Sequence, residues 1–178
     1  MSGVLIFMGE TETPHEQLIA KILSGGQTGA DRAAVDFAIE HGVAYGGWVP
    51  RDGWAEDLHQ PPGLLERYPN FVPTQSGDVG VRTSLNVRDA HATVVFTPTS
   101  VSSRGVTQTL DIATVLKRPL LVLDPESADA ERTLGEFLFA RKAGTVLNVA
   151  GPRESEARGL YQVVRSLLDA TVGFFVTS

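Results

Sequence analysis

The sequence predicts a three-layer α/β fold in which an open, mainly parallel sheet carries helices on both faces. Two observations predict it. Short apolar runs of strand length alternate with longer segments whose apolar residues recur at helical spacing, and glycine or proline separates many of them. Strands separated by helical lengths imply right-handed crossovers, and such crossovers place the strands parallel to one another.

The first elements can be justified from their residues. The apolar run IAKIL at residues 19–23 is ended by glycines, which is typical of a buried parallel strand. Residues 28–42 should form a helix, because small or apolar residues recur at helical spacing and Gly42 is placed to end it. Those recurring residues are Ala30, Ala33, Ala34, Phe37 and Ala38. The segment AYGGWVP at residues 44–50 predicts a second strand.

Later elements continue the alternation after a long irregular segment. Residues 50–80 contain five prolines and four glycines without a clear period, and a stretch of this kind in a compact domain is often functional. The elements expected after it are a short helix at 81–92, a strand at 93–98, a helix at 105–118, a strand at 119–125, a helix at 128–144, a strand at 145–152 and a helix at 155–172. Residues 1–18 are expected to be an N-terminal arm, extended or flexible, and 19–178 a single ligand-binding domain.

Composition excludes several classes of function. With 178 residues, a formal net charge of −6 and a pI near 5.2, the chain lacks the basic balance that supplies most non-specific affinity for nucleic acid. It has no cysteine, and its four histidines lack metal-ligand spacing on a helix, so no protein-ligated metal is expected. No apolar run has membrane-spanning length and no signal peptide is evident, so a cytoplasmic location without membrane contact is expected.

A glycine-rich loop, SGGQTG at residues 24–29, follows the first strand. Ligands of open parallel sheets bind outside the carboxyl ends of the strands, where glycines admit close backbone approach and helix N-termini favour anions. The loop therefore predicts a phosphate or pterin-phosphate cradle, although it lacks a Walker lysine and dinucleotide-fingerprint spacing. The alternative is a tight turn in which Thr28 and Asp31 start the helix as a capping box.

Two further segments combine polar residues at element ends. Arg82, Asn86 and Asp89 share one face of the short helix, where Arg82 is the best cation for an anionic ligand; a solvated helix face is the alternative. The loop AGPRES at residues 150–155 repeats the pattern of a strand followed by a helix, with Arg153 as an oxyanion contact and Ser155 as N-cap, unless it is an interface loop.

A third segment, WVPRDGWAEDL at residues 48–58, places aromatic and acidic residues close together. A tryptophan there either stacks on a planar ligand ring or packs beneath the long loop. Glu56 and Asp57 are candidates for ligand contacts, with a structural role as the equal alternative.

Four ordered blocks carry a resemblance to a known family: SGGQTGADRAAVDFAIEHG, GGWVPRDGWAEDL, RTSLNVRDAHATVVF and LNVAGPRESEARGLY. Over about residues 20–170 the chain resembles the molybdenum cofactor carrier family, Rossmann-like proteins related to the LOG, or lysine-decarboxylase-like, group of the SLOG superfamily. The resemblance implies a molybdopterin or nucleotide-like ligand with a phosphate, any molybdenum being held by the sulfur atoms of the pterin. It also implies a homo-oligomer, either a dimer or a tetramer.

The segment at residues 97–113 departs from the related hydrolases. LOG-type enzymes carry Pro-Gly-Gly-x-Gly-Thr-x-x-Glu there, whereas alignment places Leu110 or Ile112 at the position of the glutamate. Asp111 is adjacent, but one residue turns a helix by ~100°, so its side chain should aim elsewhere. A phosphate turn could survive through Gly105, Thr107 and Thr109.

The sequence therefore favours a binding or carrier protein without catalysis. The alternatives are a LOG-type nucleoside 5′-monophosphate phosphoribohydrolase and a nucleotide-sensing domain. The residues expected to bind the ligand are Gly25, Gly26, Gln27, Thr28, Gly29, Asp31, Arg32, Arg82, Asn86, Gly105, Thr107, Thr109, Gly151, Arg153, Glu154 and Ser155.

Overall fold

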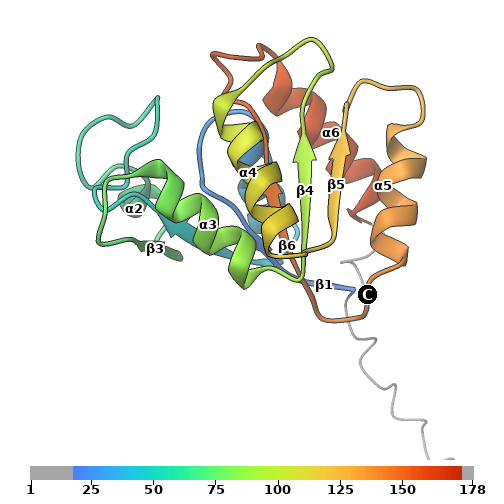
Figure 1. Cartoon of the computed structure of the whole chain (residues 1–178), viewed down its shortest axis with the longest axis horizontal. Coiled ribbons are helices and arrows are strands. Elements are labelled where there is room, and N and C mark those ends of the chain that lie inside the picture. Colours follow the sequence, from blue (N-terminus) through green and yellow to red (C-terminus); the bar gives the residue numbers. More distant parts are fainter. Residues whose placement is uncertain (1–17, 174–178) are drawn as a thin grey trace, which may run out of the picture.

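A computed structural model describes residues 18–173 of the chain as alternating strands and helices (Figure 1). The strands are β1 (Ile19–Leu23), β2 (Ala44–Val49), β3 (Phe71–Pro73), β4 (Ala92–Phe96), β5 (Leu120–Leu123) and β6 (Thr145–Ala150). The helices are α1 (Ala30–Glu40), α2 (Leu64–Arg67), α3 (Val79–Asp89), α4 (Arg104–Val115), α5 (Ala130–Phe139) and α6 (Leu160–Thr171). The predicted N-terminal arm lies, except for its last residue, outside the described residues.

All six strands form one parallel sheet in the order β3-β2-β1-β6-β4-β5. Helices α3 and α4 cover one face, and α1, α5 and α6 cover the other (Figure 1). The predicted three-layer α/β class is therefore confirmed. After β1 the chain proceeds towards one edge of the sheet through α1, and after β4 it proceeds towards the other edge through α4. The connections after β1 and β4 thus run in opposite directions, which defines a topological switch point of the kind where open parallel sheets bind ligands.

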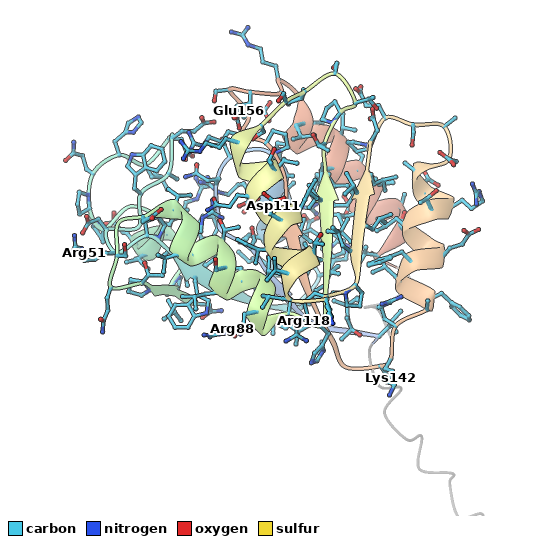
Figure 2. All side chains as sticks on the ribbon, viewed as in Figure 1. Arg51, Arg88, Asp111, Arg118, Lys142 and Glu156 are labelled. Atoms are coloured by element: carbon cyan, nitrogen blue, oxygen red, sulfur yellow. The ribbon has the colours of Figure 1, made fainter. Side chains whose placement is uncertain are left out.

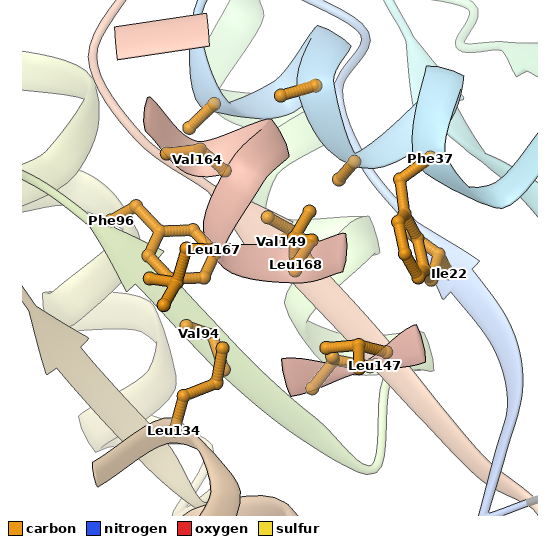
Figure 3. Packing of buried hydrophobic residues seen from close by; sticks show 14 of the residues in the cluster. Ile22, Phe37, Val94, Phe96, Leu134, Leu147, Val149, Val164, Leu167 and Leu168 are labelled. Atoms are coloured by element: carbon orange, nitrogen blue, oxygen red, sulfur yellow. The ribbon is translucent and has the colours of Figure 1, made fainter. Parts of the chain in front are cut away.

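The main hydrophobic core lies between the sheet and the layer of α1, α5 and α6. Phe37 of α1 packs beside Ile22 of β1, while Phe96, Leu134 and Leu167 bring together β4, α5 and α6 (Figure 3). A smaller cluster fills the space beneath residues 50–70: Val35, Val49, Ala55, Leu64, Tyr68 and Phe71. The second cluster fixes the long loop against the sheet and so determines where its polar residues lie.

Two short elements were missed by the sequence prediction. The segment at 50–80, which was expected to be irregular, contains α2 and the edge strand β3, so the sheet has one strand more than the sequence predicted. Only Phe71 of β3 is buried, while Val72 and Pro73 are exposed, so the strand has no apolar period that a sequence could display. Pairing with β2 forms it instead.

The predicted helix starts at Thr28 and Ser155 were wrong. Helix α1 has Gly29 as its N-cap and no side-chain capping bond, so Thr28 and Asp31 form no capping box. The last helix starts at Leu160, because the Glu154 carboxylate accepts hydrogen bonds from the N–H groups of Gly159 and Tyr161 and caps the helix from outside. Within residues 18–173, no helix has the length and apolar character needed to cross a membrane.

Candidate functional site

A cavity of about 450 Å³ lies at the carboxyl ends of the central strands. The loops after β1 and β6 form one wall, and the first turns of α3 and α4 form the other. Its lining residues are predominantly polar: Gln27, Asp31, Asp78, Val79, Gly80, Arg82, Thr83, Ser103, Arg104, Gly105, Gln108, Thr109, Ala150, Gly151, Arg153 and Glu156. The size suits a small organic ligand.

Two buried charged side chains meet in the wall of this cavity. Nη1 of Arg82 lies 3.4 Å from Oδ2 of Asp31, and the two side chains are only 13% and 3% exposed. Burial raises the pKa of the Asp31 carboxyl, while Arg82 and the backbone N–H groups of Gln27 and Gly151 oppose that rise. The amides of the two glycine-rich loops thus bind a carboxylate of the protein itself.

Gly25 provides the space in which the Arg82 guanidinium lies. A Cβ atom on Gly25 would stand 1.4 Å from Nη1 of Arg82 and 2.9 Å from Oδ2 of Asp31. Arg82 therefore packs directly on the backbone of the first glycine-rich loop. This glycine is needed for close approach of a side chain, whereas the sequence predicted close approach of a ligand.

Arg82 has hydrogen-bonding capacity left over. Its Nε atom is buried and has no hydrogen-bond acceptor among the described residues. Its one hydrogen bond, to Asp31, is longer than the ~2.7–2.9 Å of well-formed charge-assisted pairs. A buried donor without an acceptor costs free energy, so an acceptor brought by a ligand would stabilise this side chain.

Two more arginines line the cavity. The guanidinium of Arg153 stacks 5.2 Å from the ring centroid of Trp54. Burial lowers the pKa of Arg82 and outweighs the opposing effect of Asp31, and the positive charge of Arg153 lowers that pKa further. Arg104 stands exposed at the first position of α4, and its side chain forms no hydrogen bond or ion pair in the described structure. The side chains of Arg104 and Arg153 thus bring two guanidinium groups to the cavity that form no ion pair in the described structure, although three carboxylates, Asp31, Asp78 and Glu156, line it as well.

Glu156 also lines the cavity, and its carboxylate is paired with neutral donors. Its carboxylate accepts the hydroxyl of Ser103 at 3.2 Å and the N–H of Arg153 at 2.9 Å. Figure 2 places Glu156 beside the first turn of α4, and Asp111 farther along the same helix. Asp111 is exposed and does not line the cavity, as its helical position predicts.

A second polar region anchors the long loop next to the cavity. Arg32 donates from Nε and Nη2 to the carbonyl of Gly26, and it binds both oxygens of Asp57 at 2.9 and 3.0 Å. The hydrogen bond from Arg32 is the main reason why the pKa of Asp57 is lowered. The Gln27 amide bridges the backbone of Trp54 and Glu56 in the same loop.

Glu56 joins the first and last loops of the site. It accepts hydrogen bonds from the hydroxyls of Thr28 and Ser155, and the Thr28 oxygen accepts the N–H of Glu154 at 3.1 Å. Burial alone would raise the pKa of Glu56, but the hydrogen bonds from Ser155 and Thr28 outweigh it and lower that pKa. Thr28 thus joins Glu154 to the long loop, and Ser155 binds the long loop as well.

Asn86 and Gly29 also have internal partners. The Asn86 amide binds the N–H and carbonyl of Trp48 at 2.7 and 3.0 Å, which ties α3 to β2. Gly29 has φ +75°, and a Cβ atom there would stand 2.5 Å from the carbonyl oxygen of Pro152. The loops after β1 and β6 are therefore in direct backbone contact at this glycine.

The predicted binding residues thus fall into two groups. Those that line the cavity are Gln27, Asp31, Arg82, Gly105, Thr109, Gly151 and Arg153. Those that do not are Gly25, Gly26, Thr28, Gly29, Arg32, Asn86, Thr107, Glu154 and Ser155. Sequence reasoning missed Asp78, Gly80, Ser103, Arg104, Gln108 and Glu156 as lining residues. Helix spacing from Arg82 back to Asp78 and from Arg104 to Gln108 would have been the available signal.

No group of three or more histidine, aspartate or glutamate side chains in the described residues is arranged to hold a metal ion. The donors around the cavity are guanidinium, amide and hydroxyl groups. Such a set recognises oxygen-rich anions.

Fold and cavity together define a Rossmann-like α/β protein with a polar cavity, lined by three arginines and three carboxylates, at the switch point of its sheet. The chain belongs to the circularly permutated YpsA SLOG family, whose model matches residues 22–172. It is similar to a solved structure of a "Putative molybdenum carrier protein" from Syntrophus aciditrophicus SB, with 36% sequence identity and a TM-score of 0.78. That similarity covers 86% of this chain and 95% of the other. No curated protein matches the chain.

Proposed function

We propose that the protein binds and carries a small phosphate-bearing ligand, the molybdenum cofactor or a related pterin or nucleotide phosphate, in the cavity between α3, α4 and the loops after β1 and β6. The observation that carries the proposal is the buried Nε of Arg82, which lines this cavity without an acceptor in the described structure. A phosphate oxygen supplies the acceptor that the protein does not.

The neighbouring groups support an anion at this position. Arg104 and Arg153 add positive charge that no carboxylate in the described residues neutralises through an ion pair. The first turn of α4 contributes its N-terminal N–H groups, since its N-cap residue Ser103 makes no capping bond and donates instead to Glu156. The positive end of a helix dipole favours phosphate.

The similarity to the Syntrophus protein supports the choice of cargo. That protein is named for molybdenum carriage, and the similarity extends over most of both chains. This chain has no cysteine to bind molybdenum through a thiolate, so the pterin dithiolene would keep the metal while the cavity holds the phosphate.

Native mass spectrometry tests the proposal. Protein purified gently from molybdenum-fed cells should carry a stoichiometric adduct whose oxidation yields a fluorescent pterin, and Arg82→Met should lose it. Arg88→Met, on the exposed end of the same helix, should retain the adduct and serves as the matched control. Empty wild-type protein, or equal loading of the two variants, would contradict the carrier function.

One observation favours hydrolysis of a nucleoside 5′-monophosphate as a second candidate function. The position of the LOG-type glutamate on α4 holds no carboxylate, but Asp31 and Glu156 bring carboxylates to the cavity from α1 and from the loop after β6. A family whose segments are circularly permutated can supply the same chemistry from a different place in the chain. Most enzymes that cleave glycosidic bonds use two carboxylates that flank the bond.

Base release from AMP by the purified protein tests this second function. If it occurs, it should be abolished in Asp31→Asn, while Asp111→Asn should leave it unchanged because Asp111 lies outside the cavity. Binding of AMP without any release of adenine would exclude hydrolysis and leave the carrier function in place.

A further inference from the structure

Asp78 and Gln108, at the start of α3 and on α4, line the cavity but do not belong to the groups assigned to the anion. Asp78, the N-cap of α3, accepts the N–H of Gly80 at 2.8 Å through Oδ1, and its Oδ2 atom has no partner in the described structure. Gln108 of α4 also lines the cavity, and its amide forms no hydrogen bond with any described residue. These two side chains are therefore available to a ligand.

The backbone positions the two groups side by side. A Cβ atom on Gly80 would stand 2.4 Å from Nε2 of Gln108, so the amide lies directly on the first turn of α3. The same Cβ atom would stand 3.2 Å from Oδ1 of Asp78. Gly80 thus brings a carboxylate and a carboxamide together at one edge of the cavity.

The spacing from this pair to the anion site suits one ligand molecule. Asp78 and Arg82 are four residues apart at the start of α3, which places them on one side of the helix and about 6 Å apart along its axis. Arg104 and Gln108 have the same separation on α4. A ligand with its phosphate at the arginines can therefore present a ring to Asp78 and Gln108.

The two groups differ in the hydrogen bonds they offer. An ionised carboxylate only accepts. The free Oδ2 of Asp78, together with the second lone pair of Oδ1, which already accepts the Gly80 N–H, can face two adjacent N–H donors, and the amide of Gln108 can donate to a neighbouring carbonyl. A ring N–H beside an exocyclic amine, followed by a carbonyl, is the 2-amino-4-oxo edge that guanine and pterins share. Adenine presents a ring nitrogen acceptor there, which would face the carboxylate without a proton between them.

We propose that Asp78 and Gln108 select ligands with a 2-amino-4-oxopyrimidine edge and disfavour adenine. This inference rests on the proposed function, because it assumes that the phosphate of the same ligand lies at Arg82. It gives the cavity one end that recognises charge and another end that recognises the heterocycle.

Calorimetric titration of the full chain with GMP, 6-hydroxymethylpterin phosphate and AMP tests the proposal. Wild-type protein should bind GMP and the pterin phosphate at least tenfold more tightly than AMP. Asp78→Asn should remove this preference, and because asparagine is an equally good N-cap, the helix should persist and circular dichroism should be unchanged. Gln108→Met should weaken GMP binding several-fold and leave AMP binding unaffected. The tighter of the two preferred ligands identifies the source of the heterocycle.

Two results would overturn the inference in distinguishable ways. Equal affinity for GMP and AMP, with both lost in Arg82→Met, would show that the anion site exists and that Asp78 and Gln108 do not read the ring. Absence of binding for all three compounds, or binding that survives in Arg82→Met, would overturn the proposed function and this inference with it.

Discussion

Two buried arginines lie beside the first glycine-rich loop, and they differ in how many of their N–H donors have acceptors within the protein. Arg32 donates to the carbonyl of Gly26 and to both oxygens of Asp57, so most of its donors have acceptors within the protein. Arg82 has one long hydrogen bond to Asp31 and a buried Nε without an acceptor. The comparison separates a side chain that holds the fold together from one that is available to a ligand.

The same contrast extends to the regions around them. Around Arg32, the polar side chains of Gln27, Thr28 and Glu56 bind one another or the loop backbone. Around Arg82, the side chains of Arg104 and Gln108 have no such partners in the described structure. A glycine-rich loop of this fold can therefore act chiefly as scaffold, while the facing helices supply the groups for recognition.

The largest expected effect lies on the scaffold side, at Gly29. Gly29→Ala should destabilise the protein by about 3 kcal/mol or more, because its φ of +75° and ψ of −134° are disfavoured for other residues and its Cβ would clash with the backbone of Pro152. Urea unfolding measures this loss. Gly42→Ala, with φ +66° but open space around it, should cost only about 1 to 2 kcal/mol. Equal losses would show that the contact between the loops contributes nothing.

Replacing Arg32 should be nearly as damaging to stability. Arg32→Met leaves the buried Gly26 carbonyl without its donor, which costs about 1 to 3 kcal/mol, and the loss of the partly exposed pair with Asp57 adds little to this. The exposed pair of Arg88 with Asp89 provides the control, since Arg88→Met should leave the unfolding free energy almost unchanged. If the two variants unfold at the same urea concentration, Arg32 has no anchoring role.

On the recognition side, Gly25→Ala should affect binding more than folding. The new Cβ would occupy the place of Nη1 of Arg82 and displace the guanidinium, so affinity for GMP or a pterin phosphate should fall about tenfold. Stability should fall by about 1 to 2 kcal/mol, because Asp31 loses its partner. Gly77→Ala, with no atom within 4 Å of its Cβ, should change neither quantity. Unchanged affinity in Gly25→Ala would show that the position of the Arg82 guanidinium does not matter for ligand binding.

The smallest effect should be a response of the long loop to acid. The pKa of Asp57 lies below its ordinary value of 3.8, so its contribution to stability is present above that value and is lost as the pH falls through the lowered pKa. The contribution should be about 1 kcal/mol or less, since the Asp57 side chain is 39% exposed. The fluorescence of Trp54 in a Trp48→Phe background reports the loop. An identical acid transition in Asp57→Asn would rule out this pair as its cause.

Periodicity was sufficient to predict most of the fold from the sequence. Apolar runs such as that of β4, where all five residues are buried, and helical spacing such as Ala30 to Ala38 reflect burial directly. The strand β3 could not be found this way, because pairing with β2 rather than apolar pattern forms it. The start of α6 was placed too early. The Glu154 carboxylate, five residues before the N-cap, satisfies the first N–H groups of the helix in place of Ser155, and this contact depends on the folded loop.

The candidate site was harder to predict than the fold. The sequence placed the candidate site at the end of the sheet where the cavity lies, and it singled out Arg82, which lines that cavity, because strand ends and helix spacing indicate both. It could not show that Asp31 accepts a hydrogen bond from the backbone N–H of Gly151 or that Asp57 pairs with Arg32, because those contacts join residues far apart in the chain. The prediction from the sequence included residues of AGPRES but not the adjacent Glu156, because only the fold brings Glu156 to Ser103.

The Nε–H resonances of Arg82 and Arg32 in a nitrogen-15 NMR spectrum test the central claim most directly. Each can be assigned by its loss in a lysine variant. When GMP or a pterin phosphate is added, the Arg82 signal should shift because its donor gains an acceptor, while the Arg32 signal, already bonded to Gly26, should stay in place. A ligand that binds without moving the Arg82 signal would contradict the assignment of Arg82 as the anion contact.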